Sequence, residues 1–335
     1  MHNKYKKFIL KAIAAITLMV IFLLVVIPVG IISIYPKQMI GKEDTKINKV
    51  PEAKYIKVYR HLSGETEKIE FEEYVKGVVA GEMPSTFEME ALKAQAVAAR
   101  TYALSKIMRS GDSGNPAQHP SAPICDDTHC QVYRDLKELK KLKSEEWMKT
   151  GWPRIEKAVE STRGEVMYYQ GNLVEQPLFH SSSGGRTENS EDVFVSAVPY
   201  LRSVDSPYES EASHKSDVTS FTLSDFKNKI QKAYSDKSFG TVNKNTIAII
   251  SRSEGGRVTD IQIGNVTLTG RNIRDTLGLT SANFNISYDS NNIVFTTTGY
   301  GHGVGMSQWG ANGMAKSGYD YKEILTHYYS GVDIK

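Results

Sequence analysis

Residues 71–104 read FEEYVKGVVAGEMPSTFEMEALKAQAVAARTYAL, and this stretch decides how the chain folds. From Glu72 onward its apolar residues recur at the spacing of a helix that packs on one face. Gly81 followed by Pro84 predicts the end of that helix. The carboxyl group of Glu82 therefore falls in the break that follows the helix.

A second helix is expected after the break, with Ser85 or Thr86 as its N-cap. Its many alanines favour helix and allow close packing. Outside this region short strands mix with helices without regular alternation, which predicts an α+β fold. The expected strands are a hairpin within 55–71 and residues 166–169, 173–179, 247–251, 258–263, 284–288 and 293–297. Later helices are expected at 223–234, 270–277, 306–316 and 321–329.

The N-terminal part of the chain has the pattern of a membrane anchor. Residues 12–34 are almost wholly apolar and uncharged, long enough to cross a bilayer core of about 30 Å. Four lysines precede this run, so the positive-inside rule places residues 1–11 in the cytoplasm and exports the rest. Residues 35–53 are expected to form a linker, and residues 54–335 an exported α+β domain of one or two subdomains. We therefore expect a single-pass protein of the cell membrane whose folded domain is extracytoplasmic.

The charge of the chain is small and evenly spread. Its formal net charge is +3, with acidic and basic residues mixed throughout. Proteins that bind nucleic acid usually concentrate basic residues on one face or in one block. We therefore expect no nucleic-acid partner.

Glu82 is a candidate general acid. A carboxyl group at a helix end beside apolar residues can be desolvated, and burial raises its pKa toward the value that an acid needs near neutral pH. A glutamate at such a position is more often a solvated surface residue. Glu88 and Glu90 are rival candidates.

A second group of chemically active residues lies within one loop. His119, Cys125, His129 and Cys130 fall within twelve residues, and imidazole and thiolate groups are the ligands of closed tetrahedral zinc sites. His129 and Cys130 are adjacent, so the loop has to bend for both to face one ion. A disulfide between the two cysteines is the alternative in an exported protein. Two free thiols are a third possibility.

A polar loop and a glycine-rich segment are candidates for contact with a substrate. His180, Ser181, Ser182, Ser183 and Gly184 form a small-residue loop after a strand, which is either a binding surface or a flexible turn. Residues 299–310 have alternating glycines around His302, Gln308 and Trp309, but they lack the Gly-Lys-Ser/Thr ending of a phosphate loop. Trp309 could stack on a sugar or belong to the core.

Three stretches together resemble the sporulation stage II protein D family, and the similarity extends over about residues 50–335. They are residues 77–104, residues 179–194 (FHSSSGGRTENSEDVF) and residues 299–315 (GYGHGVGMSQWGANGMA). Members of that family are membrane-anchored lytic transglycosylases of peptidoglycan that act in engulfment during endospore formation. The resemblance implies that Glu82 is the catalytic residue. It also implies that His180, Ser182, Ser183 and Gly184 form a groove wall that binds sugar, with Gln95 and Arg100 as further candidates. Five positions separate Gln95 from Arg100 on the helix, so the alternative is that the two do not both face the groove.

The resemblance also implies a reaction that needs one carboxyl group. Retaining glycosidases use two carboxyl groups about 5 Å apart. In a lytic transglycosylase, Glu82 would protonate the oxygen between muramic acid and glucosamine and then deprotonate the muramic C6 hydroxyl, leaving a 1,6-anhydro end. Some clostridial relatives resemble the cluster at His119, Cys125, His129 and Cys130 and bind zinc there. Others lack the cysteines, so zinc is expected to be structural and not required for the shared chemistry.

Two other functions compete with glycan cleavage. The first is a non-catalytic wall-binding scaffold or modifier of an amidase, against which a glutamate at position 82 argues. A zinc peptidase is disfavoured because no His-Glu-x-x-His helix occurs and four protein ligands leave no position for water. The resemblance also implies the partners, which are glycan strands stripped of stem peptides, a membrane protein and an amidase of the engulfment machinery.

Overall fold

The computed structural model describes residue 50 and residues 53–335, and all of these belong to one compact unit, Ile47–Lys335. The predicted cytoplasmic segment, the anchor at residues 12–34 and most of the linker lie outside the described residues. Within the described part, no helix combines the length and the apolar character needed to span a bilayer.

The described chain begins with a hairpin that leads directly into the first helix. Strand β1 (Tyr55–Tyr59) pairs antiparallel with β2 (Thr66–Glu70) and parallel with the short β3 (Ile124–Cys125). Helix α3 (Phe71–Glu82) follows β2 without a loop, and its N-cap Glu70 accepts a hydrogen bond from the Glu73 backbone N–H. Glu82 is therefore the last residue of the helix, whereas the sequence placed it in the break after the helix; the break begins one position later, at Met83.

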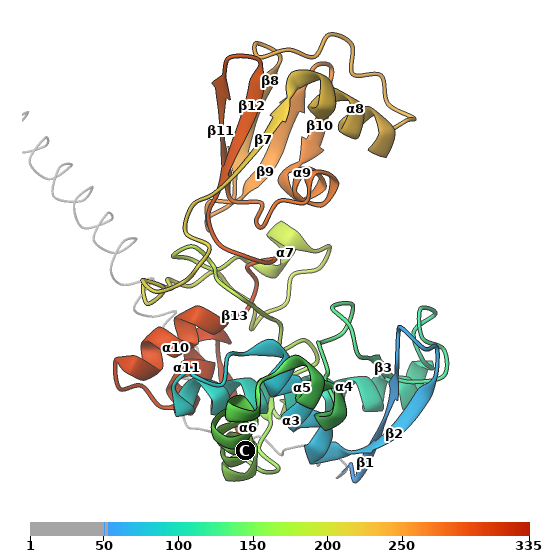
Figure 1. The fold of residues 1–335 in the computed structure, drawn as a ribbon, viewed down its shortest axis with the longest axis vertical. Coiled ribbons are helices and arrows are strands. Elements are labelled where there is room, and N and C mark those ends of the chain that lie inside the picture. The colour runs from blue at the N-terminus through green and yellow to red at the C-terminus, as the bar shows by residue number, and fades with distance from the viewer. Residues whose placement is uncertain (1–49, 51–52) are drawn as a thin grey trace, which may run out of the picture. The chain divides into compact units, whose positions relative to one another are not determined.

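Helix α4 (Met89–Ser113) is the centre of the larger core. Its alanines are buried, and it packs against α3, α6, α10 and α11 (Figure 1). The helix begins at Met89, so the prediction that Ser85 or Thr86 caps it is wrong. The cause is a tertiary contact: the N-cap is Glu88, and its backbone N–H donates to the Asn312 side chain at 2.8 Å.

The other elements around α4 are short. The predicted strand at 173–179 is wrong in extent, because only its ends pair, in β5 and β6. Strands β14, β4 and β5 form one sheet, and β13 pairs parallel with β6. The elements are α5 (Leu136–Leu142), α6 (Glu145–Ser161), β4 (Met167–Tyr169), β5 (Asn172–Leu173), β6 (Phe179–His180), α7 (Ser190–Val193), β13 (Met306–Ser307), α10 (Gln308–Lys316), α11 (Tyr321–Tyr328) and β14 (Val332–Ile334).

Residues 217–297 build a second hydrophobic core of their own. Two three-stranded antiparallel sheets, in the orders β10-β9-β8 and β11-β12-β7, pack with two helices around Phe226, Ile261 and Phe295. The elements are β7 (Asp217–Thr222), α8 (Leu223–Ala233), β8 (Ile247–Arg252), β9 (Val258–Ile263), β10 (Val266–Thr269), α9 (Gly270–Leu277), β11 (Phe284–Asp289) and β12 (Asn292–Thr297). The predicted α+β class is confirmed for the described residues.

Candidate functional site

Glu82 lies at the end of α3, where a loop from residue 131 onward crosses the helix. The close approach requires a glycine, because a Cβ added at Gly81 would lie 2.9 Å from the Val132 carbonyl oxygen. The Val132 backbone N–H donates to Glu82 Oε1 at 2.6 Å. This hydrogen bond fixes one oxygen of the carboxyl group.

Gln308, the first residue of α10, approaches the other oxygen of Glu82. Its Nε2 lies 3.5 Å from Glu82 Oε2 and 3.5 Å from Gln95 Oε1, which are long hydrogen bonds. Gln95 on α4 is fully buried, and its Nε2 has no hydrogen-bond partner among the described residues. The structure thus places the predicted residue Gln95 in one group with Glu82, and Gln308 joins the two.

The surroundings of Glu82 suit an acid. Burial raises the pKa of its carboxyl group and is the largest effect. The Val132 N–H, the Gln308 amide and the charge of Arg134 act in the opposite direction, because each favours the carboxylate. The carboxyl group can therefore hold a proton at a higher pH than an exposed glutamate. When it releases the proton, the resulting carboxylate is stabilised by these three groups.

The two rival glutamates lie where a carboxyl group is exposed or already engaged by neighbouring residues. Glu88 is exposed at the N-cap of α4. Glu90 forms an ion pair with Lys93 at 2.7 Å and accepts a hydrogen bond from the Tyr321 backbone N–H. These contacts hold α4 against its neighbours, so the geometry favours Glu82 as the acid.

The four predicted metal ligands come together in space. The ligand atoms of His119, Cys125, His129 and Cys130 all lie within 4.8 Å of one another, and both cysteines are free. The loop bends as required, because His129 Nδ1 lies 3.7 Å from the Cys125 sulfur and 3.6 Å from the Cys130 sulfur. Ligands about 2.0 to 2.3 Å from a tetrahedral ion are about 3.3 to 3.8 Å apart, so the donor set fits zinc.

Two further features suit metal binding. His119 Nδ1 lies 2.8 Å from the Ala122 carbonyl oxygen, which orients the ring so that Nε2 faces the Cys130 sulfur at 3.4 Å. The hydrogen bond from Cys130 lowers the pKa of the Cys125 thiol to about 5. A thiolate, which is the form that binds metal, is thus favoured at Cys125.

The ligand cluster and Glu82 share one short segment of chain. Gln131, next to the ligand Cys130, donates from Nε2 to Tyr74 Oη at 3.0 Å and to the Ala99 carbonyl oxygen at 3.3 Å. Val132, which holds Glu82, is the following residue. The position of the N–H that stabilises the carboxylate therefore depends on how the ligand loop is anchored.

The polar loop after β6 is ordered by a buried carboxylate. The Ser183 hydroxyl donates to Glu209 Oε1 at 2.6 Å, and the Gly184 N–H donates to Glu209 Oε2 at 2.8 Å. His180 and Ser182 are buried, and His180 Nε2 and Ser182 Oγ have no hydrogen-bond partner within the described part of the chain. The loop is therefore held by hydrogen bonds and is not a flexible turn. Gly184 is its exposed residue.

Arg100 has a different role from the one predicted, because its side chain is 1% exposed and belongs to the core. Its Nε and Nη2 donate to the two oxygens of Glu72 at 2.9 and 2.8 Å, and its remaining donors reach the carbonyl oxygens of Val159 and Glu165. Five positions along a helix rotate Arg100 by about 140° from Gln95, so the two face different surroundings. We therefore remove Arg100 from the sugar-binding set.

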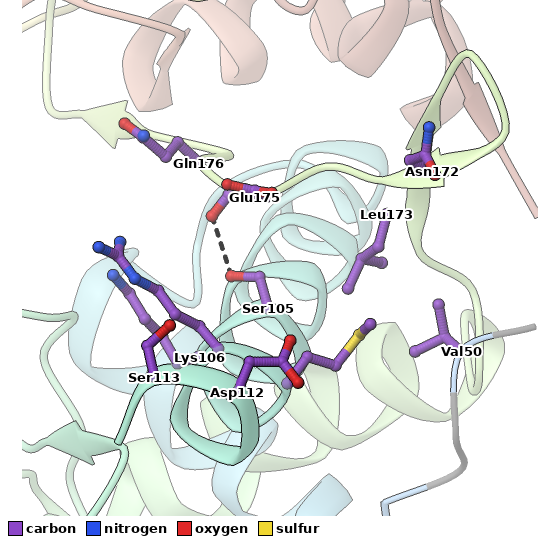
Figure 2. Close-up of a pocket in the computed structure, with 11 residues that line it drawn as sticks. Val50, Ser105, Lys106, Asp112, Ser113, Asn172, Leu173, Glu175 and Gln176 are labelled. Atoms are coloured by element: carbon purple, nitrogen blue, oxygen red, sulfur yellow. Dashed lines mark hydrogen bonds between the residues drawn. The ribbon is translucent and has the colours of Figure 1, made fainter. Parts of the chain in front are cut away.

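One cavity lies beside Trp309, and another lies at the C-terminal end of α4. Half-buried Trp309 meets Phe87 edge to face at 4.8 Å between ring centroids and lines a cavity of about 280 Å³ with Tyr208 and Asn312. Figure 2 shows a larger cavity, about 650 Å³, at the C-terminal end of α4, where the Ser105 hydroxyl donates to the Glu175 carbonyl oxygen. Trp309 thus packs against the core and also faces open space.

Sequence reasoning missed two contacts of Glu82. Gln308 was visible only as part of a glycine-rich segment, and 226 residues separate it from Glu82. The Val132 contribution comes from the backbone, so no side chain signals it. The third unpredicted group, Glu209, is an isolated acidic residue in a loop.

Comparison with known proteins identifies the family of the chain. The family model described as "Stage II sporulation protein" matches residues 59–169. The chain is 42% identical over 283 residues to stage II sporulation protein D of Bacillus subtilis, covering 83% of this chain and 78% of that protein. Its identity to the protein of the same name from Bacillus amyloliquefaciens is 40% over 282 residues, with the same shares covered.

The chain belongs to the stage II sporulation protein D family, which is involved in sporulation. A protein named "Amidase enhancer" from Bacillus subtilis is a more distant relative. It is 30% identical over 312 residues, which cover 78% of this chain and 40% of that protein.

Proposed function

We propose that this chain is a lytic transglycosylase that cleaves the bond between muramic acid and glucosamine in peptidoglycan during engulfment. The observation that carries the proposal is the surroundings of Glu82. Burial raises the pKa of its carboxyl group, and the groups that shift this pKa are an N–H, an amide and an arginine, with no second carboxylate among them. A single carboxyl group suits a reaction in which the substrate supplies the nucleophile.

The reaction would proceed in two proton transfers at Glu82. The protonated carboxyl group gives its proton to the glycosidic oxygen as the bond from that oxygen to the muramic anomeric carbon breaks. The resulting carboxylate accepts hydrogen bonds from the Val132 N–H and the Gln308 amide, which stabilise it. It then takes the proton of the muramic C6 hydroxyl as the C6 oxygen bonds to the anomeric carbon. Glu82 ends protonated, and no water is consumed.

We further propose that His119, Cys125, His129 and Cys130 hold a structural zinc ion. Four protein ligands close the coordination sphere, so the ion would supply stability to the loop and not a site for water. The benefit to catalysis would be indirect, through the segment that carries the Val132 N–H. The shared chemistry at Glu82 does not require the metal.

The proposed setting follows from the N-terminal sequence and the family. Residues 12–34 would anchor the chain as a single-pass membrane protein, with residues 54–335 outside the cytoplasm. Peptidoglycan strands stripped of stem peptides would be the substrate. A membrane protein and an amidase of the engulfment machinery would be partners.

Product analysis tests the proposed reaction directly. The full-length chain, incubated with peptide-free glycan strands, should release 1,6-anhydro-muramic ends that mass spectrometry detects as a product 18 daltons lighter than the hydrolysed one. Reducing ends would mean hydrolysis and would refute the transglycosylase mechanism.

The similarity to the protein named "Amidase enhancer" supports a second candidate, a non-catalytic activator of an amidase. The two candidates differ in what Glu82→Gln does. An activator would stimulate an added amidase equally well with either residue, whereas the enzyme would lose strand cleavage.

A further inference from the structure

A cavity of about 460 Å³ lies between α7 and α9, away from the groups around Glu82. The two helices are joined there by Arg271, whose guanidinium donates to the Val193 carbonyl oxygen at 3.1 Å. Arg257, Arg274 and His302 all line this cavity. Neither arginine was predicted to bind a ligand, and His302 was noted only as part of the glycine-rich segment.

Arg257 is a fixed, buried wall of the cavity. Its side chain is 4% exposed, and it donates to Glu188 Oε1 at 3.1 Å and to the Ser183 carbonyl oxygen at 3.3 Å. Its guanidinium lies against Gly303, where an added Cβ would be 2.1 Å from the guanidinium carbon. Its Nε is buried and has no hydrogen-bond partner among the described residues.

Arg274 on α9 also has an Nε donor without a hydrogen-bond acceptor among the described residues. Its Nε is also buried without a partner, and no ion pair reaches its guanidinium from any residue that the structure describes. Buried polar groups without a partner are rare and destabilising in proteins. Two such donors on one cavity indicate that an acceptor belongs there.

The charges around the cavity define the acceptor. Arg257 is balanced by Glu188, and Arg271 lies 3.7 Å from Asp275. The charge of Asp275 also acts on Arg274, but no carboxylate among the described residues forms an ion pair with Arg274. Burial, followed by the charges of Arg257 and Arg274, lowers the pKa of His302 to about 3, so its ring is neutral beside two cations.

Other acidic residues line the cavity but are engaged or exposed. Glu191 pairs with Arg202, Asp260 accepts a hydrogen bond from the Ser251 hydroxyl, and Asp192 is exposed. These carboxylates would repel a multiply charged anion more strongly than a singly charged one. The surroundings therefore select a monoanion that offers two oxygens, as a carboxylate does.

We propose that this cavity binds a carboxylate, whose oxygens accept the hydrogen bonds that the Nε groups of Arg257 and Arg274 lack. Two sources share this chemistry, a small free carboxylate and the lactyl carboxylate of a muramic residue. We assign the site to the lactyl carboxylate, and this assignment rests on the proposed function, in which peptidoglycan is the substrate. Removing a stem peptide converts the lactyl amide, which is neutral, into this carboxylate, so the cavity would recognise peptide-free strands.

Binding measurements on the purified full-length chain test the proposal. The probes are N-acetylmuramic acid, N-acetylglucosamine, which lacks the lactyl group, and lactate. With arginine labelled in nitrogen-15, N-acetylmuramic acid should shift the Nε resonances of Arg257 and Arg274, and it should bind about tenfold more tightly than N-acetylglucosamine. Arg274→Gln should abolish that preference and Arg274→Lys should restore part of it. The matched control Arg163→Gln should keep it, because Arg163 follows the end of α6 and forms an exposed ion pair with Glu160.

Equal binding of N-acetylmuramic acid and N-acetylglucosamine, with unmoved Nε resonances, would overturn the carboxylate site without needing any variant. Lactate that binds as tightly as N-acetylmuramic acid and responds equally to Arg274→Gln would overturn the assignment to muramic acid. A chain that discriminates the two sugars but cleaves no strand would refute the proposed enzyme and leave this site standing. A chain that cleaves strands but binds the two sugars equally would refute this site and leave the proposed enzyme standing.

Discussion

Gln308→Leu isolates the contribution of one amide to the acidity of Glu82. Gln308 Nε2 lies 3.5 Å from Glu82 Oε2, and this amide lowers the pKa of the carboxyl group because it favours the carboxylate. Leucine has nearly the same size and cannot donate, so the variant should raise that pKa. Glu82 must be protonated to act as the acid, and activity is therefore lost as the pH rises through its pKa. The high-pH limb of kcat/KM should move to higher pH.

The size of the shift follows from the contact. A hydrogen bond to a charged group of ordinary length contributes about 1.5 to 3 kcal/mol, and 1.36 kcal/mol corresponds to about one pH unit. The 3.5 Å contact is at the long limit, so the limb should move by less than about one unit. The same variant also leaves Gln95 Oε1 without its partner, which should lower the free energy of unfolding by about 1 to 3 kcal/mol.

The assay is the rate of strand cleavage as a function of pH, on peptide-free glycan, with the thermal stability of each variant measured alongside. Gln231→Leu is the matched control, because that glutamine is exposed on α8 and donates only to a nearby carbonyl oxygen. A limb that stays in place or moves to lower pH would refute the assigned role of Gln308. A loss of rate at every pH as large as that of Glu82→Gln would instead make Gln308 a catalytic residue.

Three further predictions follow from the same contacts. Glu82→Gln should lower turnover by about two to four orders of magnitude. The Glu82→Gln substitution should also raise the melting temperature at neutral pH but not below pH 4. The pKa of Glu82 is higher in the folded state than in the unfolded state, so its ionisation lowers the stability only above the unfolded pKa. The full-length chain should contain about one zinc ion, and chelation should increase hydrogen exchange in residues 114–131 while α3 and α4 stay protected. A mass two daltons below the reduced value without zinc would establish the disulfide. Arg100→Met should lower the free energy of unfolding by about 3 to 5 kcal/mol, because it leaves Glu72 buried without a partner, and KM should not change. A raised KM at unchanged stability would restore Arg100 to the sugar site.

The sequence predicted best those elements whose causes are local. In the second core the expected ranges 258–263 and 270–277 match β9 and α9, because their apolar and capping patterns lie within the elements themselves. The cluster of His119, Cys125, His129 and Cys130 could be predicted as a group for the same reason, since its members fall within twelve residues and only one loop has to bend. Patterns that are complete within about twenty residues need no knowledge of the rest of the fold.

The failures have tertiary causes. The start of α4 was misplaced because Asn312, 224 residues away, binds the N–H of Glu88 and makes it the N-cap. Arg100 was grouped with Gln95 because the family resemblance implied a sugar-binding role for both. Only the position of Glu72 shows that the guanidinium is needed in the core. The sequence around Glu88 does not indicate its contact with Asn312, and the sequence around Arg100 does not indicate its contact with Glu72.

The glycines of residues 299–310 allow close approaches that bring one residue of this segment to Glu82. A Cβ at Gly305 would lie 2.0 Å from the Leu178 carbonyl oxygen, and a Cβ at Gly310 would lie 1.9 Å from Tyr328 Oη. Both therefore allow the segment to pass against β6 and α11 at distances that no other residue permits. Gln308 stands between these two close approaches, and it is this passage that brings its amide to Glu82. The alternating glycines, which in the sequence resemble a binding loop, thus act by placing the one residue among them that reaches the carboxyl group.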